Sequence, residues 1–258
     1  MEELEKLEKE MDIRIIFASE SGARSWGLDS PISDYDVRFI YHRPVREYLK
    51  IHRPKDVING KNGNIDFEGY DVYKYLELVA KSNVNMLEML NSDIVYYDNA
   101  SSLMDAIREF ANSSFSPITA FYHYHALGMN NFSKYVLHSS EKDKNLAKCY
   151  VYALRGLLGA IYVYDNWELL PKDFEEVVKT SEILPEEVRS MYLEKFIPMK
   201  RGLLVEAPQR SKIVDEFLAA EFAARKELLM NAKKRRIEGK EISEDISDIL
   251  VDTLLAGL

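Results

Sequence analysis

The spacing of apolar residues changes near residue 115, and this change restricts the chain to few fold classes. Before it, short β-branched or alternating runs such as 12–19 and 34–41 are separated by glycine, proline and aspartate. After it, helical spacing continues to the end, most clearly in the apolar stripe from Leu154 to Ile161. Short strands with connecting helices, followed by long helices alone, predict an α+β fold.

Residues 111–117, Ala-Asn-Ser-Ser-Phe-Ser-Pro, combine small residues with a helix breaker, so a domain boundary is expected there. We predict an α/β domain over 1–112 and an all-helical domain over 113–258. In the first domain, the patterns predict strands at 12–19, 34–41 and 64–70, helices at 1–11 and 72–81, and a connecting loop with a short helical turn over 45–50 and 54–62.

Charge and cysteine content narrow the class of protein. The chain has 34 basic and 43 acidic residues and a net charge of −9, which argues against a nucleic-acid coat protein but leaves a local basic groove possible. The single cysteine, Cys149, cannot form an intrachain disulfide, and the first residues do not resemble a signal peptide. Since no run approaches the roughly 18 apolar residues of a membrane helix, we expect a cytoplasmic protein with no membrane partner.

The strongest chemical signal lies in residues 33–38, Ser-Asp-Tyr-Asp-Val-Arg. Side chains alternate on a strand, so Asp34, Asp36 and Arg38 should share one face, and the residues between them should face the core. Two carboxylates one pleat apart repel each other, and a divalent cation between them stabilises both. Magnesium prefers such oxygen ligands together with substrate phosphates.

Two further segments add to this signal. In residues 64–68, Asp66 and Glu68 share a face of a predicted strand. If this strand lies beside 34–41, three carboxylates converge. Such a set of carboxylates can hold two metal ions. After the first strand comes Glu-Ser-Gly-Ala-Arg-Ser-Trp-Gly, residues 20–27. Gly22 would let the backbone approach a ligand, a helix beginning there would present N–H groups to a triphosphate, and Arg24 would add a charged contact.

This order of motifs resembles the nucleotidyltransferase signature of the DNA polymerase beta superfamily. Within it, residues 20–27 and 33–41 resemble the predicted nucleotidyltransferases of the RNA-repair-pathway (RlaP-like) group, over about residues 12–180. The resemblance implies a mixed sheet packed on helices. It also implies transfer of a nucleoside monophosphate from a nucleoside triphosphate to a hydroxyl, with magnesium or manganese, and it suggests an RNA 3′ end as the acceptor.

The resemblance assigns roles by position. Asp34, Asp36 and Asp66 would be the metal ligands and catalytic carboxylates, and Asp66 is preferred to Glu68 because it precedes Asp71 by five residues. Ala23 stands where the family usually has a serine, whose role Ser21 or Ser25 would have to take. The expected nucleotide-binding residues are Gly22, Ala23, Arg24, Ser25, Ser33, Arg38, Lys148, Tyr152 and Arg155.

Several alternatives stay open. Arg38 contacts phosphate, or it pairs with Asp36 or Glu68. The i, i+4, i+7 stripe of Lys148, Tyr152 and Arg155 faces either the cleft or solvent. The short basic run 233–236 is either a solvated helix face or an RNA contact.

The function itself has alternatives. The departure at Ala23 motivates a catalytically weak nucleotide sensor, and the motifs also allow transfer to a small molecule or a protein. A toxin–antitoxin component is a third alternative, which the long helical part of the chain disfavours.

Overall fold

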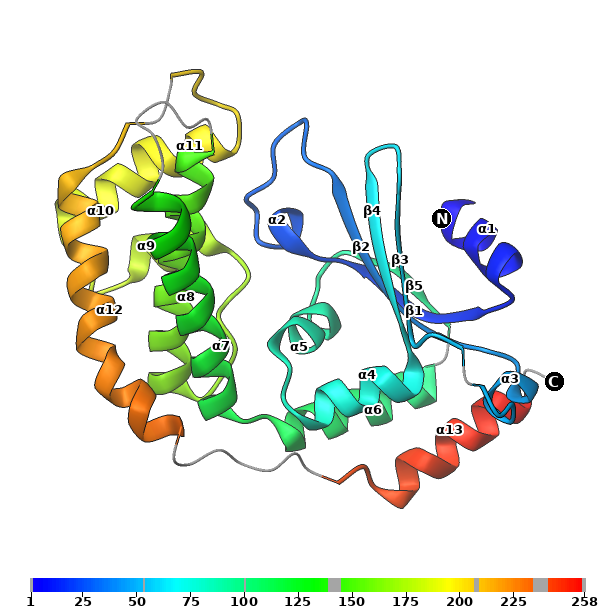
Figure 1. Cartoon of the computed structure of the whole chain (residues 1–258). Coiled ribbons are helices and arrows are strands. Elements are labelled where there is room, and N and C mark those ends of the chain that lie inside the picture. The colour runs from blue at the N-terminus through cyan, green and yellow to red at the C-terminus, as the bar shows by residue number, and fades with distance from the viewer. Residues whose placement is uncertain are drawn as a thin grey trace. The chain divides into compact units, whose positions relative to one another are not determined.

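The computed structural model describes residues 2–52, 54–99, 101–138, 145–206, 209–233 and 241–256, and it divides into two compact units (Figure 1). The sheet unit comprises 1–25, 34–115 and 238–258, and the helical unit comprises 26–33 and 116–237. This division differs from the linear one predicted, 1–112 and 113–258. The reason is packing: loop 26–33 is held by the helices, and the last helix packs in the sheet unit.

The sheet unit is built on five strands in the order β3-β4-β2-β1-β5. β2 and β4 run parallel, whereas the other neighbours are antiparallel, so the sheet is mixed, as expected of an α+β fold. The strands predicted near 12–19, 34–41 and 64–70 are confirmed as β1, β2 and β4. Their bounds, with those of two unpredicted strands, are β1 Arg14–Glu20, β2 Tyr35–His42, β3 Val57–Asn62, β4 Ile65–Asp71 and β5 Val95–Asp98.

β3 occupies residues that were expected to form a loop. The segment carries little apolar signal beyond Val57 and the buried Ile58, and its second half is polar. Its backbone pairs with β4 along the whole strand, from Val57 opposite Tyr70 to Asn62 opposite Ile65. The ladder with its neighbour, and not the local sequence, therefore makes this segment a strand.

One face of the sheet packs on α1, Glu2–Met11. Leu4 and Leu7 of that helix join a core with Val37, Phe39 and Tyr41 of β2, which confirms the alternation predicted for this strand. Tyr35, at the start of the strand, is instead 38% exposed. The remaining elements of the sheet unit are α2 Gly22–Ser25, α3 Val45–Tyr48, α4 Val72–Ala80, α5 Val84–Leu90, α6 Ser101–Ser114 and α13 Glu244–Ala256.

The helical unit is formed by α7 Pro117–Asn130, α8 Leu146–Asn166, α9 Phe174–Thr180, α10 Glu186–Met191, α11 Ile197–Lys200 and α12 Lys212–Lys233, with π-helical turns η1 Asn131–Val136 and η2 Tyr192–Phe196. By length and composition alone, α8 is apolar enough to cross a membrane. However, 72% of its apolar window is buried. That burial is typical of the core helix of a soluble protein.

α7 and α8 cross at a pair of glycines. A Cβ on Gly156 would overlap the backbone N and Cα of Gly128, and a Cβ on Gly128 would lie 2.8 Å from the carbonyl oxygen of Ala153. Backbone lies on both sides of the contact, so neither helix can yield by turning a side chain. The two glycines therefore set the distance between these helices.

We expect Gly156→Val to destabilise the protein by about 2–3 kcal/mol, because the added methyl groups force two backbones apart. The loss should appear as a fall in Tm of roughly 5–10 °C in thermal denaturation followed by circular dichroism. Asp165→Ala, at an exposed position of the same helix, is the control and should leave Tm within about 1–2 °C. An unchanged Tm for Gly156→Val would show that the helix contact is not close-packed.

Candidate active site

A tight glycine turn joins β1 to the candidate site. Gly22 lies two residues after the end of β1 and has φ +67°, a conformation that L side chains rarely adopt. A Cβ at Gly22 would overlap Oδ2 of Asp36 and lie 3.0 Å from its Cγ. The N–H of Ser21 donates to the carbonyl oxygen of Asp36 at 2.8 Å. The turn and the start of β2 are thus fitted to each other, and glycine is required between them.

The other residues near this turn that were expected to bind the nucleotide are packed or hydrogen-bonded within the protein. Ala23 is buried, and the Ser25 hydroxyl donates to the carbonyl oxygen of Gly22 at 2.9 Å. The guanidinium of Arg24 lies 4.2 Å from the centre of the Tyr35 ring, and its Nε is 3.8 Å from Glu20. Ser33 accepts a hydrogen bond from the N–H of Ser30 at 2.9 Å, which closes a turn before β2.

Three carboxylates of the sheet surround one guanidinium. The parallel register places Asp36 beside Asp66 and Arg38 beside Glu68, so the two strands are adjacent, which is the condition for their carboxylates to converge. Arg38 reaches Asp36 at 3.7 Å, Asp66 at 3.3 Å and Glu68 at 3.5 Å. Of the two alternatives for Arg38, this structure contains the ion pair. All four side chains are partly exposed, so a ligand can reach them.

Asp34 is paired with a second cation, Lys61. β2 begins at Tyr35, so the alternation expected from Asp34 onward does not hold at its first position. The carboxylate of Asp34 accepts a hydrogen bond at 2.6 Å from Lys61 at the end of β3, and this bond raises the pKa of Lys61. The charges of Asp66 and Asp36 also raise the pKa of Lys61, so the convergence of Asp34 with these two carboxylates stays a prediction. Among the described residues, no three acidic, histidine or cysteine side chains are arranged to hold a metal ion.

Glu20 is a site residue that the sequence did not reveal. Its side chain is wholly buried at the end of β1; Oε1 accepts the N–H of Asp36 at 2.9 Å and Oε2 accepts the Tyr96 hydroxyl at 2.5 Å. Burial raises the pKa of Glu20, although these hydrogen bonds act in the opposite direction. Glu20 ties the backbone of Asp36 to β5. The sequence signal for this role was an acidic residue at the end of a largely apolar strand.

The predicted stripe on α8 lies within the helical unit. Arg155 is 4% exposed and its guanidinium lies 3.5 Å from the centre of the Trp26 ring, which Tyr152 meets edge-on at 6.0 Å. Lys148 is exposed, with its ammonium 5.6 Å from the Tyr152 ring. Because Arg155 is buried, the alternative in which the whole stripe faces solvent is excluded. Arg155 and Tyr152 instead contact Trp26 in loop 26–33, the segment between the glycine turn and Asp34.

A mixed sheet, a glycine turn fitted against an Asp-x-Asp strand and an acid on the parallel neighbour define a nucleotidyltransferase-like protein of the polymerase beta type. The model of the RNA repair pathway DNA polymerase beta family, RlaP, matches residues 1–248. The chain belongs to this family, so the predicted membership is confirmed, and the match extends beyond the stretch of resemblance seen in the sequence.

Two individual proteins are similar to the chain. The uncharacterized protein YcgL of Bacillus subtilis (strain 168) is 30% identical over 256 residues, which cover 98% of this chain and 95% of that protein. The crystal structure of a nucleotidyltransferase-like protein from Exiguobacterium sibiricum 255-15 covers 88% of this chain and 73% of its own, with 10% identity and a TM-score of 0.35.

Proposed function

We propose that the protein transfers a nucleoside monophosphate from a nucleoside triphosphate to a hydroxyl acceptor. The observation that carries the proposal is the group of Asp36, Asp66 and Glu68 around Arg38, directly against the turn at Gly22. Family membership supports the same class of reaction. The transfer forms a bond from the acceptor oxygen to the α-phosphorus and breaks the bond to the β-phosphate. Pyrophosphate leaves with the electron pair of the broken bond.

The donor set fits magnesium or manganese. Its members are carboxylates, the hard oxygen ligands that these ions take, and they already hold a cation, the guanidinium of Arg38. Asp36 and Asp66 would hold the metal, and Asp34 would join them when Lys61 releases it. A bound ion would neutralise the triphosphate and lower the pKa of the acceptor hydroxyl.

The remaining roles belong to the chain itself. The backbone at Gly22 and Ala23, with the side chains of Arg24, Ser25 and Ser33, is proposed to hold the triphosphate. Arg38, once displaced from the carboxylates, would turn to the phosphates. Asp66 would orient the acceptor hydroxyl and take its proton. For the stripe of Lys148, Tyr152 and Arg155, nucleotide binding remains our proposal.

An RNA 3′ end is the proposed acceptor, because the family description concerns RNA repair. The net charge of −9 favours recognition of a short local segment over binding along a polynucleotide. Residues 234–236 of the basic run lie outside the described residues. A cytoplasmic location also remains a prediction.

The test is transfer of α-labelled nucleotides, one at a time, onto an RNA mixture with magnesium or manganese, with Asp36→Asn as the inactive control. Label in RNA with the wild type alone would support the proposal and identify the nucleotide. Pyrophosphate release only when cell extract is added would replace RNA with a small-molecule or protein acceptor. Nucleotide binding without release under any condition would refute the enzyme and leave the sensor suggested by Ala23.

Replacing Arg38 with methionine should destabilise the metal-free protein by roughly 1–3 kcal/mol, because three carboxylates lose their shared cation. Magnesium should then raise the Tm of the variant more than that of the wild type, since the ion no longer competes with the guanidinium. Differential scanning calorimetry with and without magnesium measures both effects. Arg46→Met, at an exposed position of α3, is the control; equal magnesium shifts for all three proteins would contradict the proposed metal position.

A further inference from the structure

A pocket of about 420 Å³ lies on the α1 side of the sheet. Its floor is apolar and comes from the helix and from the strands, with Leu4, Leu7, Val37, Ile65 and Phe67 among the lining residues. Val37 alternates along β2 with Asp36 and Arg38, so the pocket is on the opposite face from the carboxylate cluster. A volume of this size accommodates a small ligand such as a nucleoside.

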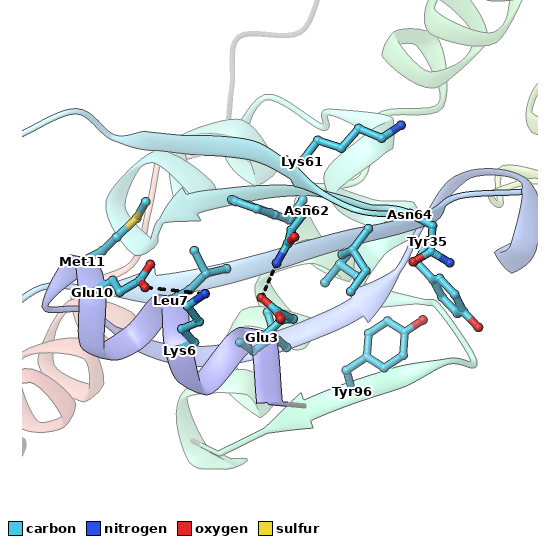
Figure 2. Close-up of a pocket in the computed structure, with 14 residues that line it drawn as sticks. Glu3, Lys6, Leu7, Glu10, Met11, Tyr35, Lys61, Asn62, Asn64 and Tyr96 are labelled. Carbon is cyan, nitrogen blue, oxygen red and sulfur yellow. Dashed lines mark hydrogen bonds and ion pairs between the residues drawn. The ribbon is translucent and has the colours of Figure 1, made fainter.

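The pocket combines flat aromatic walls with amide groups. Figure 2 shows the rings of Tyr35 and Tyr96 at the end of the pocket farthest from Met11. The amides of Asn62 and Asn64 line the side formed by the β3–β4 hairpin, where Asn62 donates to Glu3 at 2.7 Å. Aromatic rings stack on any nucleobase, and asparagine amides read the edge of a purine.

The walls of the pocket are directly connected to the candidate active site. Lys61 lines the pocket and also donates to Asp34. Tyr35 lies in the chain between Asp34 and Asp36, and the Tyr96 hydroxyl donates to Glu20, which in turn accepts the N–H of Asp36. An occupant of the pocket therefore contacts the side chains that position the carboxylate strand.

We propose that this pocket binds a purine base, with Tyr35 and Tyr96 as the stacking surface and the two asparagines as the edge contacts. The inference rests on the proposed function, because the base would belong to an acceptor nucleotide. Lys61, with its positive charge beside both the pocket and Asp34, would hold a phosphate on the ribose of that nucleotide. The base comes either from an RNA 3′ end or from a free nucleoside.

The test uses the full-length, isotope-labelled protein in EDTA, so that metal-dependent nucleotide binding does not contribute. Adenosine and a 3′-hydroxyl triadenylate are titrated separately, and nuclear magnetic resonance follows the amide signals. Both should shift the side-chain signals of Asn62 and Asn64. The double variant Asn62→Ala/Asn64→Ala should weaken binding at least about tenfold, whereas Asn59→Ala, on the same strand but outside the pocket lining, should change it less than about twofold.

Tighter binding of triadenylate than of adenosine would support the pocket and assign it to an RNA end; equal or weaker binding would support it as a nucleoside site. Absence of shifts at millimolar adenosine, or equal losses in the Asn59 and the double variant, would overturn the inference. Asp36→Asn should leave adenosine binding intact. A protein that binds adenosine here but transfers no nucleotide would refute the proposed function without refuting the pocket.

Discussion

Substitution of Asp66 by asparagine should lower the rate of nucleotide transfer at least about a hundredfold, the range over which one preorganised charged group acts. Asp66 is the register partner of Asp36, and both contact the same guanidinium. Glu68 is one pleat further along β4, beside Arg38 itself. Glu68→Gln should therefore lower the rate of nucleotide transfer by about tenfold or less. The two rates, measured at saturating nucleotide, decide which acid is the third carboxylate.

The paired substitutions control for each other. Both remove one negative charge from the cluster around Arg38, so their effects on Tm should be similar. A larger rate loss for Glu68→Gln than for Asp66→Asn would reverse the assignment. Equal, small losses in both variants would place the chemistry elsewhere in the protein.

Gly22→Ala should also reduce transfer at least about a hundredfold, for a geometric reason. The new methyl group must displace the Asp36 carboxylate, and the backbone at φ +67° disfavours alanine by roughly 1–2 kcal/mol. The rate loss should therefore exceed what the change in stability explains. Transfer rate and Tm are measured on the same preparation.

Gly202→Ala is the matched control for this prediction. Gly202 also has a positive φ, +73°, but a Cβ there would meet only Ser30 at 3.7 Å and Pro31 at 4.0 Å, which are ordinary contacts. It should show the backbone cost in Tm with transfer retained. A Gly22→Ala variant as active as Gly202→Ala would contradict the fit between the turn and Asp36.

The sequence was most informative for features that depend only on residues close together in the chain. Alternation along 34–41 and the apolar run at 12–19 specified strands without reference to the rest of the chain. The helix caps are local as well: the carboxylate of Asp71 accepts the N–H of Tyr73 at 3.1 Å at the start of α4, and the side chain of Asn83 accepts the N–H of Asn85 at 3.0 Å at the start of α5.

The features that the sequence did not predict share one cause: each depends on pairing with residues that are distant in the chain. β3 exists because β4 lies beside it, and the sequence of Val57–Asn62 gives little sign of a strand. Lys61 belongs to this unpredicted strand, so its bond to Asp34 was unpredictable as well. The role of Glu20 likewise required the position of Tyr96 on β5.

Loop 26–33 belongs to the helical unit and the C-terminal helix belongs to the sheet unit, so a single cut in the chain does not separate the two units. Loop 26–33 is held in the helical unit by Arg201 and Lys200, which donate to the carbonyl oxygens of Gly27 at 2.7 Å and Leu28 at 3.0 Å. A fragment beginning at residue 116 would lose these partners and would expose Arg155, whose guanidinium now lies on Trp26. The helical half is therefore not a transferable module: a fusion or chimera would have to carry the loop with it.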